Sequence, residues 1–383
     1  MPVAGMSVRQ IPLADVGKPE LDRWRRLAAA AIEPNPFFEP DYAMAQARAL
    51  NRMADVALVV VIEGDEWTAC VPVQRLGRWH RVPISSVSTW RGSEALPSLI
   101  GTPLLSVPEA ATALVRGLVA TAGSSFAALE WLVADGPAYE PISDAIARSG
   151  LRCIEFERFS RAFLTRRPDD DYFERSMKGK HRGVMRRRWK KLDAELGGEP
   201  RLVDVTGDPA AVQELIEIEG SSKLAAGGLV LKSHPAHERF FHEMCAGFAA
   251  AGRLQLHALR FGDRTLAIRC NLLADPGIFY FKVAYDESFA QFSPGIRLEV
   301  ESFHLFHDRP ESEWVDSCSD PNNETMNRLM PERRTLVTLV LIKPGLRAPV
   351  TAAAVRSVRA LRERAMAESR PPSDARLARP SPE

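Results

Sequence analysis

The sequence contains no hydrophobic run long enough to cross a membrane. A membrane-spanning helix needs about 18 or more consecutive apolar residues, and no uncharged stretch of that length occurs among the 383 residues. The N-terminal segment MPVAGMSVRQ also lacks the charged and then apolar pattern of a secretion signal. These absences predict a cytoplasmic protein without a transmembrane segment.

Cysteine is scarce, and its spacing indicates neither a disulfide framework nor a zinc site. The five cysteines occur without a C-x-x-C pair, and an odd number in apolar surroundings is typical of reduced core thiols. His234, His237 and His242 lie three and five residues apart around a proline, which is not a recognised metal-ligand spacing. We therefore expect no metal site and no permanently bound cofactor.

Neither sign of charge prevails over the whole chain, because 50 lysines and arginines face 49 aspartates and glutamates. Residues 178–191, with the sequence KGKHRGVMRRRWKK, are the exception. Met185, Trp189, Leu192 and Leu196 recur at helical spacing, so we predict a helix with one apolar face and basic side chains around the rest.

This basic helix has three interpretations. In the first, it binds the phosphates of a cofactor or a tRNA. In the second, it attaches to an anionic membrane surface or polymer, and in the third it is a solvated connector. Sequence-specific DNA binding is disfavoured, because no helix-turn-helix or zinc pattern accompanies the basic residues.

The length and the apolar content of 45% are sufficient for two hydrophobic cores. In each half, an antiparallel hairpin is followed by alternating strands and helices, and the first hairpin turns at Gly64 and the second at Gly262. This order predicts an α/β fold with mixed sheets, built as two repeats of one unit. We divide the chain into residues 1–165, a basic connecting helix at 166–200, a second domain at 201–345, and a C-terminal helix with a disordered tail at 346–383.

Three motifs follow one another in the second half of the chain. A strand end with the pattern K-x-A-Y-D occupies residues 282–286, and S-P-G occupies residues 293–295 at a helix start. V-D-S-C occupies residues 315–318, and Glu332 and Arg333 follow a short helix. These motifs resemble the CelD/BcsL-type acetyltransferase family, a branch of the GNAT superfamily. The resemblance covers roughly residues 170–344 and, more weakly, the first half. It implies tandem GNAT-like repeats joined by the basic helix.

The implied reaction is transfer of an acyl group from acyl-CoA, such as acetyl-CoA, to an amine or hydroxyl, often in a polysaccharide or lipid context. The family also resembles the Fem-type transferases, which use aminoacyl-tRNA. One departure concerns the acceptor: relatives carry E-x-x-G-W-K, whereas this chain has Glu219 and Lys223 but a serine in place of the tryptophan. The resemblance alone implies substrate binding by Glu219 and Lys223; a surface ion pair one helical turn apart is the alternative.

The start of the helix at Pro294 is a candidate binding site for the phosphates of the donor. Proline suits the first turn, Ser293 is a natural N-cap, and the free N–H groups of Gly295 and Ile296 favour an anion. With Gln291 and Arg297, these residues form a partial version of the GNAT pyrophosphate loop. An ordinary capped helix is the alternative.

Lys282 and Tyr285 are candidate catalytic residues on the preceding strand. Alternation places Tyr280 and Lys282 on one face, and a lysine in an apolar strand needs a carboxylate, a phosphate or a cleft. Lys282 therefore has either an electrostatic role in the site or a structural ion pair. Tyr285 either donates a proton to the thiolate leaving group or packs at the strand end.

Three further polar residues are candidates on neighbouring strands. Arg269 and Asn271 share one face of a hairpin, which either lines the acceptor site or is solvated. Asp316 either acts as a general base toward an amine acceptor or caps the next helix.

Two alternatives to an acyl-CoA-dependent enzyme remain open: a non-catalytic binding platform with degenerate repeats, and an aminoacyl-tRNA-dependent transferase.

Overall fold

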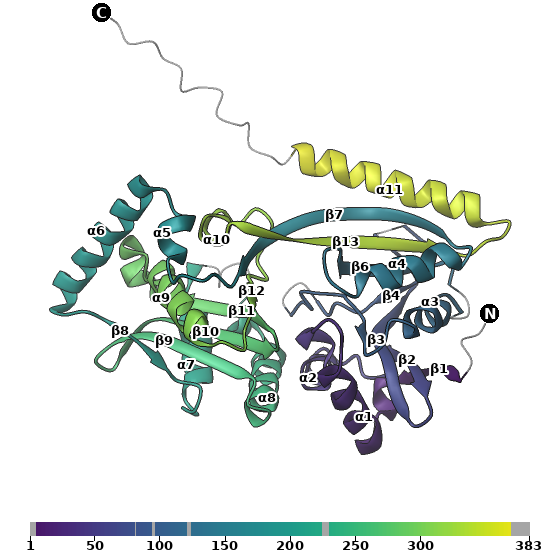
Figure 1. Ribbon diagram of the computed structural model, residues 1–383, viewed down its shortest axis with the longest axis horizontal. Helices are drawn as coiled ribbons and strands as arrows, with labels where there is room; N and C mark the ends of the chain where they lie inside the picture. Colours follow the sequence, from purple (N-terminus) through teal and green to yellow (C-terminus); the bar gives the residue numbers. More distant parts are fainter. Residues whose placement is uncertain (1–4, 81, 94–95, 121–123, 224–229, 369–383) are drawn as a thin grey trace, which may run out of the picture.

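The computed structural model describes residues 5–80, 82–93, 96–120, 124–223 and 230–368. The predicted tail after residue 368 lies outside these ranges. The described strands form one continuous mixed sheet in the order β1-β2-β3-β4-β6-β13-β7-β12-β11-β10-β9-β8, and β5 pairs with β3. Figure 1 shows the two ends of this sheet as two lobes, with the long strands β7 and β13 running between them.

Apart from β1, β4 and β5, which were not predicted, the strands follow the predicted hairpins and alternating segments closely. They are β1 (Met6–Pro12), β2 (Val56–Glu63), β3 (Glu66–Leu76), β4 (Ser86–Thr89), β5 (Leu104–Leu105), β6 (Phe126–Val133), β7 (Arg152–Thr165), β8 (Arg201–Asp204), β9 (Leu254–Phe261), β10 (Arg264–Ala274), β11 (Gly277–Tyr285), β12 (Trp314–Asp316) and β13 (Glu332–Ile342).

The α-helices lie on both faces of the sheet. They are α1 (Lys18–Ala29), α2 (Pro40–Ala49), α3 (Ala110–Ala120), α4 (Tyr139–Arg148), α5 (Tyr172–Ser176), α6 (Gly179–Leu196), α7 (Ala211–Gly220), α8 (Pro235–Ala250), α9 (Pro294–Asp308), α10 (Glu324–Leu329) and α11 (Ala348–Glu368). Short 3-10 helices are η1 (Leu13–Asp15), η2 (Pro36–Phe38), η4 (Leu231–Ser233) and η5 (Glu287–Phe292). None of the described helices combines the length and the apolar character that a membrane span requires.

Two long strands join the halves in a way that the sequence pattern did not predict. We expected each half to close with its own strand, at residues 151–164 and 334–342. Instead, β13 lies between β6 and β7 and pairs antiparallel with both, and the end of β7 pairs with β12. The sheet therefore runs unbroken past the expected boundary at residue 165, and the division into domains stays a prediction.

The basic helix forms where it was expected. It is α6, and Gly197 ends it with a φ of 76°, a left-handed conformation that glycine adopts without a steric penalty. Met185 and Leu192 are buried, whereas the side chains of Arg186, Arg187 and Arg188 are exposed. The apolar stripe thus anchors α6 and its basic side faces solvent.

An aromatic cluster packs the N-terminal half against the C-terminal half. Phe37 contacts Phe279 with a ring separation of 6.0 Å, and Tyr42 contacts Phe240 at 5.2 Å and Phe281 at 5.7 Å. Such edge-to-face pairs add roughly 0.5–1.5 kcal/mol each to the burial of the rings. Because η2 and α2 supply two of these rings, they pack beside α8 and β11, where the candidate site is located.

Candidate active site

Strands β11 and β12 pair in parallel over only three residues and then separate. Gly277 to Phe279 face Trp314 to Asp316, after which β12 ends and β11 continues to Tyr285. The N-terminal half repeats this geometry, since β4 and β6 pair in parallel only at Ser86 to Ser88 and Phe126 to Ala128. Each half therefore has one point where two parallel strands diverge.

The chain itself fills the divergence of the N-terminal half. Gly101 donates its N–H to the carbonyl of Trp131 at 2.9 Å, and Thr102 Oγ1 accepts the N–H of Val133 at 3.1 Å. The guanidinium of Arg91 lies 3.1 Å from the centre of the Trp131 ring. Residues 98–102 thus occupy the space beside β6, which leaves the divergence of β11 and β12 as the candidate active site.

Lys282 lies beside this divergence and pairs with Glu219 of α7. Its Nζ is 2.5 Å from Glu219 Oε1, while Glu219 Oε2 accepts the N–H of Leu231 at 2.7 Å. The carboxylate of Glu219 is almost fully buried and the Lys282 side chain is 21% exposed. The structure thus brings together two of the predicted site residues and holds Lys282 at a fixed position.

Two predictions about these residues are wrong. A register shift between Cys270 and Asn271 leaves Phe281 without a partner on β10, so Tyr280 and Lys282 do not share a face. Tyr280 packs on Arg269, whereas Lys282 points to α7. Lys223 does not pair with Glu219; its side chain is 89% exposed, and its N–H donates to Glu287 at 2.8 Å. For Tyr280 and Lys282, the cause is the bulge at Phe281 of β11, which reverses the side-chain faces that simple alternation predicts.

His237 is a residue of this region that the sequence did not reveal. It lies on α8, close enough to Lys282 and Glu219 for their charges to act on it. Partial burial, and next the charge of His234, lower the pKa of His237 below its usual value. Its Nδ1 has no hydrogen-bond partner among the described residues. The sequence contains three histidines close together, but their spacing gives no sign that His237 approaches Lys282.

The start of α9 adjoins the end of β11. A Cβ placed on Gly295 would lie 3.5 Å from Cδ1 of Tyr285, so the Tyr285 ring stands beside the first turn of α9. Tyr285 is 39% exposed, and Gln291 is exposed as well. In contrast to these exposed side chains, the side chain of Ile296 is partly buried and packs against the hydrophobic core between α9 and β11. The predicted proton donor and the predicted phosphate site are therefore neighbours.

Ser293 does not cap α9 with its side chain, contrary to the prediction. The residue adopts a left-handed conformation with φ of 58°, and its Oγ accepts a hydrogen bond from Arg188 at 3.0 Å. Arg297 is held by Asp193 of α6 at 2.6 Å and by Glu301 at 2.9 Å. Helix α6 is thus fastened to the first turn of α9, and it contributes an exposed arginine there.

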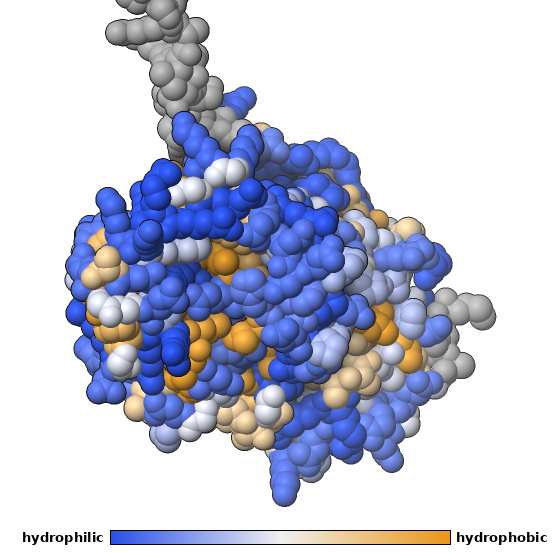
Figure 2. Space-filling model, turned by 60° about the vertical axis from the view of Figure 1, so that its left-hand side comes forward, coloured by the Kyte–Doolittle hydropathy of each residue, from blue (hydrophilic) through white to orange (hydrophobic). Residues whose placement is uncertain are grey.

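The surface around α6 is strongly hydrophilic. Figure 2 brings this side of the molecule forward and shows polar side chains over most of it, with apolar patches between them. Arg186 pairs with Glu174 at 2.9 Å, and Arg182 donates to the carbonyl of Met177 at 3.1 Å. Part of the basic charge is therefore neutralised locally, and the rest faces solvent.

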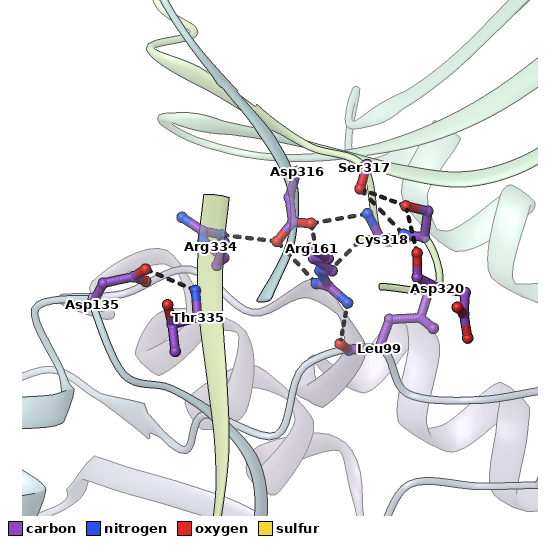
Figure 3. A network of polar contacts seen from close by, with 10 residues as sticks. Leu99, Asp135, Arg161, Asp316, Ser317, Cys318, Asp320, Arg334 and Thr335 are labelled. Carbon is purple, nitrogen blue, oxygen red and sulfur yellow. Dashed lines mark hydrogen bonds and ion pairs between the residues drawn. The ribbon is translucent and has the colours of Figure 1, made fainter. Parts of the chain in front are cut away.

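Asp316 is a buried structural anchor, and its environment does not suit a general base. Its oxygens bind Arg161 at 2.7 and 2.9 Å and Arg334 at 3.1 Å, and they accept the N–H of Cys318 at 2.9 Å (Figure 3). The carboxylate is fully buried. Burial by itself raises the pKa of Asp316, but the charges of Arg161 and then Arg334 hold it below its usual range. A carboxylate bound in this way has little tendency to take up a proton.

The Asp316 network connects strands that are distant in the sequence. Arg161 belongs to β7, Asp316 to β12 and Arg334 to β13, and Arg161 also donates to the carbonyl of Leu99 at 2.8 Å. The guanidinium of Arg334 lies 4.0 Å from the ring centre of Trp314. We therefore assign Asp316 a structural role, in which it holds the two halves of the protein together. Cys318 is buried beside it, and burial raises the pKa of its thiol.

Arg269 and Asn271 lie away from the other predicted substrate-binding residues. Arg269 is fully buried and forms an ion pair with Glu299 of α9. Asn271 donates to Gln255 at 2.9 Å and is also buried. Both face α9, whereas Glu219 lies on α7. The alternative of a solvated face is therefore wrong, and a role of Arg269 and Asn271 in binding the acceptor stays a prediction.

A comparison with protein-family models supports the GNAT part of the resemblance in the second half, whereas the CelD/BcsL-type family stays a prediction. Residues 179–309 match the acetyltransferase (GNAT) domain. The GNAT match begins at α6 and ends after α9, so it includes the basic helix, Lys282 and the start of α9. It covers roughly a third of the chain and stops before β12. No curated protein matches the chain.

Solved structures with similar folds cover most of the chain. The crystal structure of FemX has a TM-score of 0.56 at 9% identity, covering 88% of this chain and 97% of that one. A conserved protein of unknown function from Bacteroides thetaiotaomicron scores 0.54 at 12% identity, covering 84% and 97%. The C-terminal domain of a putative lysylphosphatidylglycerol synthetase from Agrobacterium fabrum scores 0.50 at 13% identity, covering 87% and 94%. At sequence identities this low, the similarity shows that the folds are alike and nothing more.

Proposed function

We propose that the protein is a GNAT-type acyltransferase that acts where β11 and β12 separate. The observation that carries the proposal is the parallel pairing of these strands over three residues, with the free end of β11 leading directly to the first turn of α9. Acyl-CoA is the proposed donor, and an amine or hydroxyl of a small molecule, saccharide or envelope precursor is the proposed acceptor. The family match over residues 179–309 supports the reaction class.

The proposed donor lies with its phosphates at the start of α9. The free N–H groups of Gly295 and Ile296 and the positive end of the helix dipole attract an anion there. Arg188 adds a full positive charge from α6, since its guanidinium reaches Ser293. The thioester then extends along β11 toward Lys282.

The proposed chemistry is direct transfer without a covalent enzyme intermediate. The acceptor nitrogen or oxygen attacks the thioester carbonyl, its bond to carbon forms, and the carbon–sulfur bond breaks. Lys282, positioned by Glu219, stabilises negative charge that develops on the carbonyl oxygen. Tyr285 donates a proton to the departing thiolate, and His237, neutral at physiological pH, receives the proton of the acceptor.

Calorimetry with acetyl-CoA and longer acyl-CoAs tests the donor, and thiol release in the presence of amines tests the reaction. We expect saturable binding, and we expect Lys282→Met to slow thiol release at least about tenfold with little change in donor affinity. Lys232→Met is the matched control, because Lys232 also pairs with a glutamate of α7, Glu217, but on the exposed surface. Absence of binding by every acyl-CoA would reject this donor and leave the non-catalytic platform and the aminoacyl-tRNA donor, which tRNA binding distinguishes.

An aminoacyl-tRNA donor is the second candidate, favoured by the exposed basic side of α6 beside the start of α9. It predicts tight tRNA binding that weakens steeply with salt, because each neutralised phosphate releases counterions. Replacing Arg186 to Arg188 with glutamine would then abolish tRNA binding. Acyl-CoA binding without tRNA binding would reject this candidate.

A further inference from the structure

The C-terminal helix α11 is fixed to the sheet by one of its faces. Ala352, Val355 and Val358 are each at most 7% exposed and belong to a hydrophobic cluster with residues of β6, β7 and β13. Arg359 donates to the carbonyl of Glu155 on β7 at 2.7 Å. Figure 1 shows α11 along β7 and β13, with no other described element on its outer side. The described part of the chain therefore leaves the opposite face of α11 uncovered.

This outer face carries the most exposed apolar side chains of the described residues. Leu346, just before α11, is 101% exposed, Val350 is 73% exposed and Leu361 is 64% exposed. No other large apolar side chain in the described ranges exceeds 47%. Val350, Ala353, Ser357 and Leu361 are three or four residues apart, so they lie along one side of the helix, which we call the outer stripe. Exposed apolar side chains gathered on one face mark a contact with another surface.

Positive charge borders the outer stripe. Arg359 and Arg362 contact β7 on the inner side of α11 and form ion pairs. Arg347, Arg356 and Arg364 are exposed and form no ion pair within the described part of the chain. Arg356 and Arg364 each follow a residue of the outer stripe by three positions, so they stand next to it. A partner that fits this face is therefore both apolar and negatively charged.

Charge decides between a second copy of this helix and a lipid surface. Residues 346–364 contain five arginines and one acidic residue, Glu363, which is already paired with Arg359 at 2.8 Å. Two copies of the outer face would therefore set arginines against arginines. A bilayer with anionic lipid supplies an apolar layer and negative head groups side by side. Because α11 lacks the combination of length and apolar character that a membrane span requires, it would lie in the plane of the bilayer surface.

We propose that the outer face of α11 binds the surface of a bilayer that contains anionic lipid. Val350 and Leu361 enter the boundary between head groups and acyl chains, and Arg356 and Arg364 bind lipid phosphates. The inner face of α11 is already packed on the sheet, so the helix binds without refolding. The proposal does not rest on the acyltransferase activity, because lipid binding is measured without a donor or an acceptor.

Co-sedimentation of the full chain with vesicles tests the proposal. We expect binding to vesicles of equal parts phosphatidylglycerol and phosphatidylcholine, little binding to phosphatidylcholine alone, and weaker binding at high salt. Val350→Ser combined with Leu361→Ser should lower the affinity for the mixed vesicles about tenfold, because it removes the exposed apolar side chains. Arg356→Gln combined with Arg364→Gln should lower it by a similar factor.

Two matched controls change side chains outside α11. Lys190→Gln combined with Lys191→Gln removes two exposed positive charges from α6. Val8→Ser combined with Val203→Ser removes two valines that are each 38% exposed. Both controls should leave the affinity for the mixed vesicles unchanged.

Several results would overturn the proposal. They are no binding to the mixed vesicles, equal binding to phosphatidylcholine alone, unchanged affinity in either α11 variant, and an equal loss in the α6 control, which would mean that general charge governs binding. A dimer in sedimentation velocity that is lost in the Val350→Ser and Leu361→Ser variant would assign the outer face to a second copy instead. The replaced side chains of α11 are exposed, so these variants should unfold in urea like the parent protein.

Discussion

Arg188 Nη1 donates a hydrogen bond to Ser293 Oγ at 3.0 Å, which joins the basic helix α6 to the first turn of α9. Ser293 adopts a left-handed backbone conformation, so its side chain is directed to Arg188 instead of capping its own helix. The positive end of the α9 dipole and an exposed guanidinium therefore meet at one point. This is a suitable arrangement for binding a phosphate.

Arg188→Ala should weaken donor binding. A hydrogen bond from a charged group contributes about 1.5–3 kcal/mol, so we expect the Kd for acyl-CoA to rise by roughly tenfold or more. Lys190→Ala, on the same helix and exposed, should change the Kd little. Equal effects of the two substitutions in calorimetry would mean that α6 acts through its general charge and not through this contact.

Asp316→Asn should destabilise the protein strongly. Removing the charge leaves the buried arginines Arg161 and Arg334 without their counterion, and loss of one partner from a buried pair costs about 3–5 kcal/mol. Urea denaturation measures the free energy of unfolding. Asp263→Asn, at the exposed β9–β10 turn, is the control. A loss below about 1 kcal/mol would show that Asp316 is not an anchor of the three strands.

Glu33 should make stability fall as the pH rises toward neutrality. The side chain is 3% exposed, and burial raises the pKa of Glu33 to about 7, against the opposing charge of Arg334. Between the unfolded value of 4.5 and about 7, the folded state keeps a proton that the unfolded state releases. Stability is therefore lost over this window as pH rises, by about 3 kcal/mol in total.

Glu33→Gln removes this titration and keeps an oxygen that can accept the N–H of Ala138. The free energy of unfolding of both proteins should be measured in urea at about pH 5 and about pH 8. We expect the variant to lose less stability than the parent protein between these values. Parallel pH profiles would mean that Glu33 titrates normally.

Gly101→Ala should be destabilising because the chain passes too close to β6. An added Cβ would lie 1.8 Å from the carbonyl oxygen of Glu130, and backbone atoms cannot move aside cheaply. We expect a loss of about 2 kcal/mol or more in the free energy of unfolding. Gly207→Ala, where a Cβ meets nothing within 4 Å, is the control and should be nearly neutral. Similar losses at the two positions would contradict the filled divergence in the N-terminal half.

The sequence predicted most individual strands and helices, because hydrophobic periodicity and glycine turns are local signals. It missed β1, α2 and the short elements β4, β5 and α5. Residues 6–12 alternate weakly, and residues 40–49 are rich in alanine, so neither segment carries a strong periodic pattern. The hairpins β2–β3 and β9–β10 are confirmed.

The candidate site was predicted less well. Lys282 and Glu219 were both named, but their contact was not, since they are 63 residues apart. A single unpaired residue, Phe281, reverses the face of every later residue on β11, and side-chain alternation alone gives no sign of it. Asp316 resembled a base in sequence because the two arginines that bind it come from distant strands.

By itself, the sequence determined the α/β class, the succession of hairpins and alternating elements, and an amphipathic basic helix between the halves. These features depend on patterns within about 20 residues. Only the tertiary structure decided that β7 and β13 cross between the halves, that Lys282 meets Glu219, and that α6 lies beside the start of α9. Such pairings depend on packing between distant segments, which have many compatible partners in sequence but only one arrangement in the folded chain.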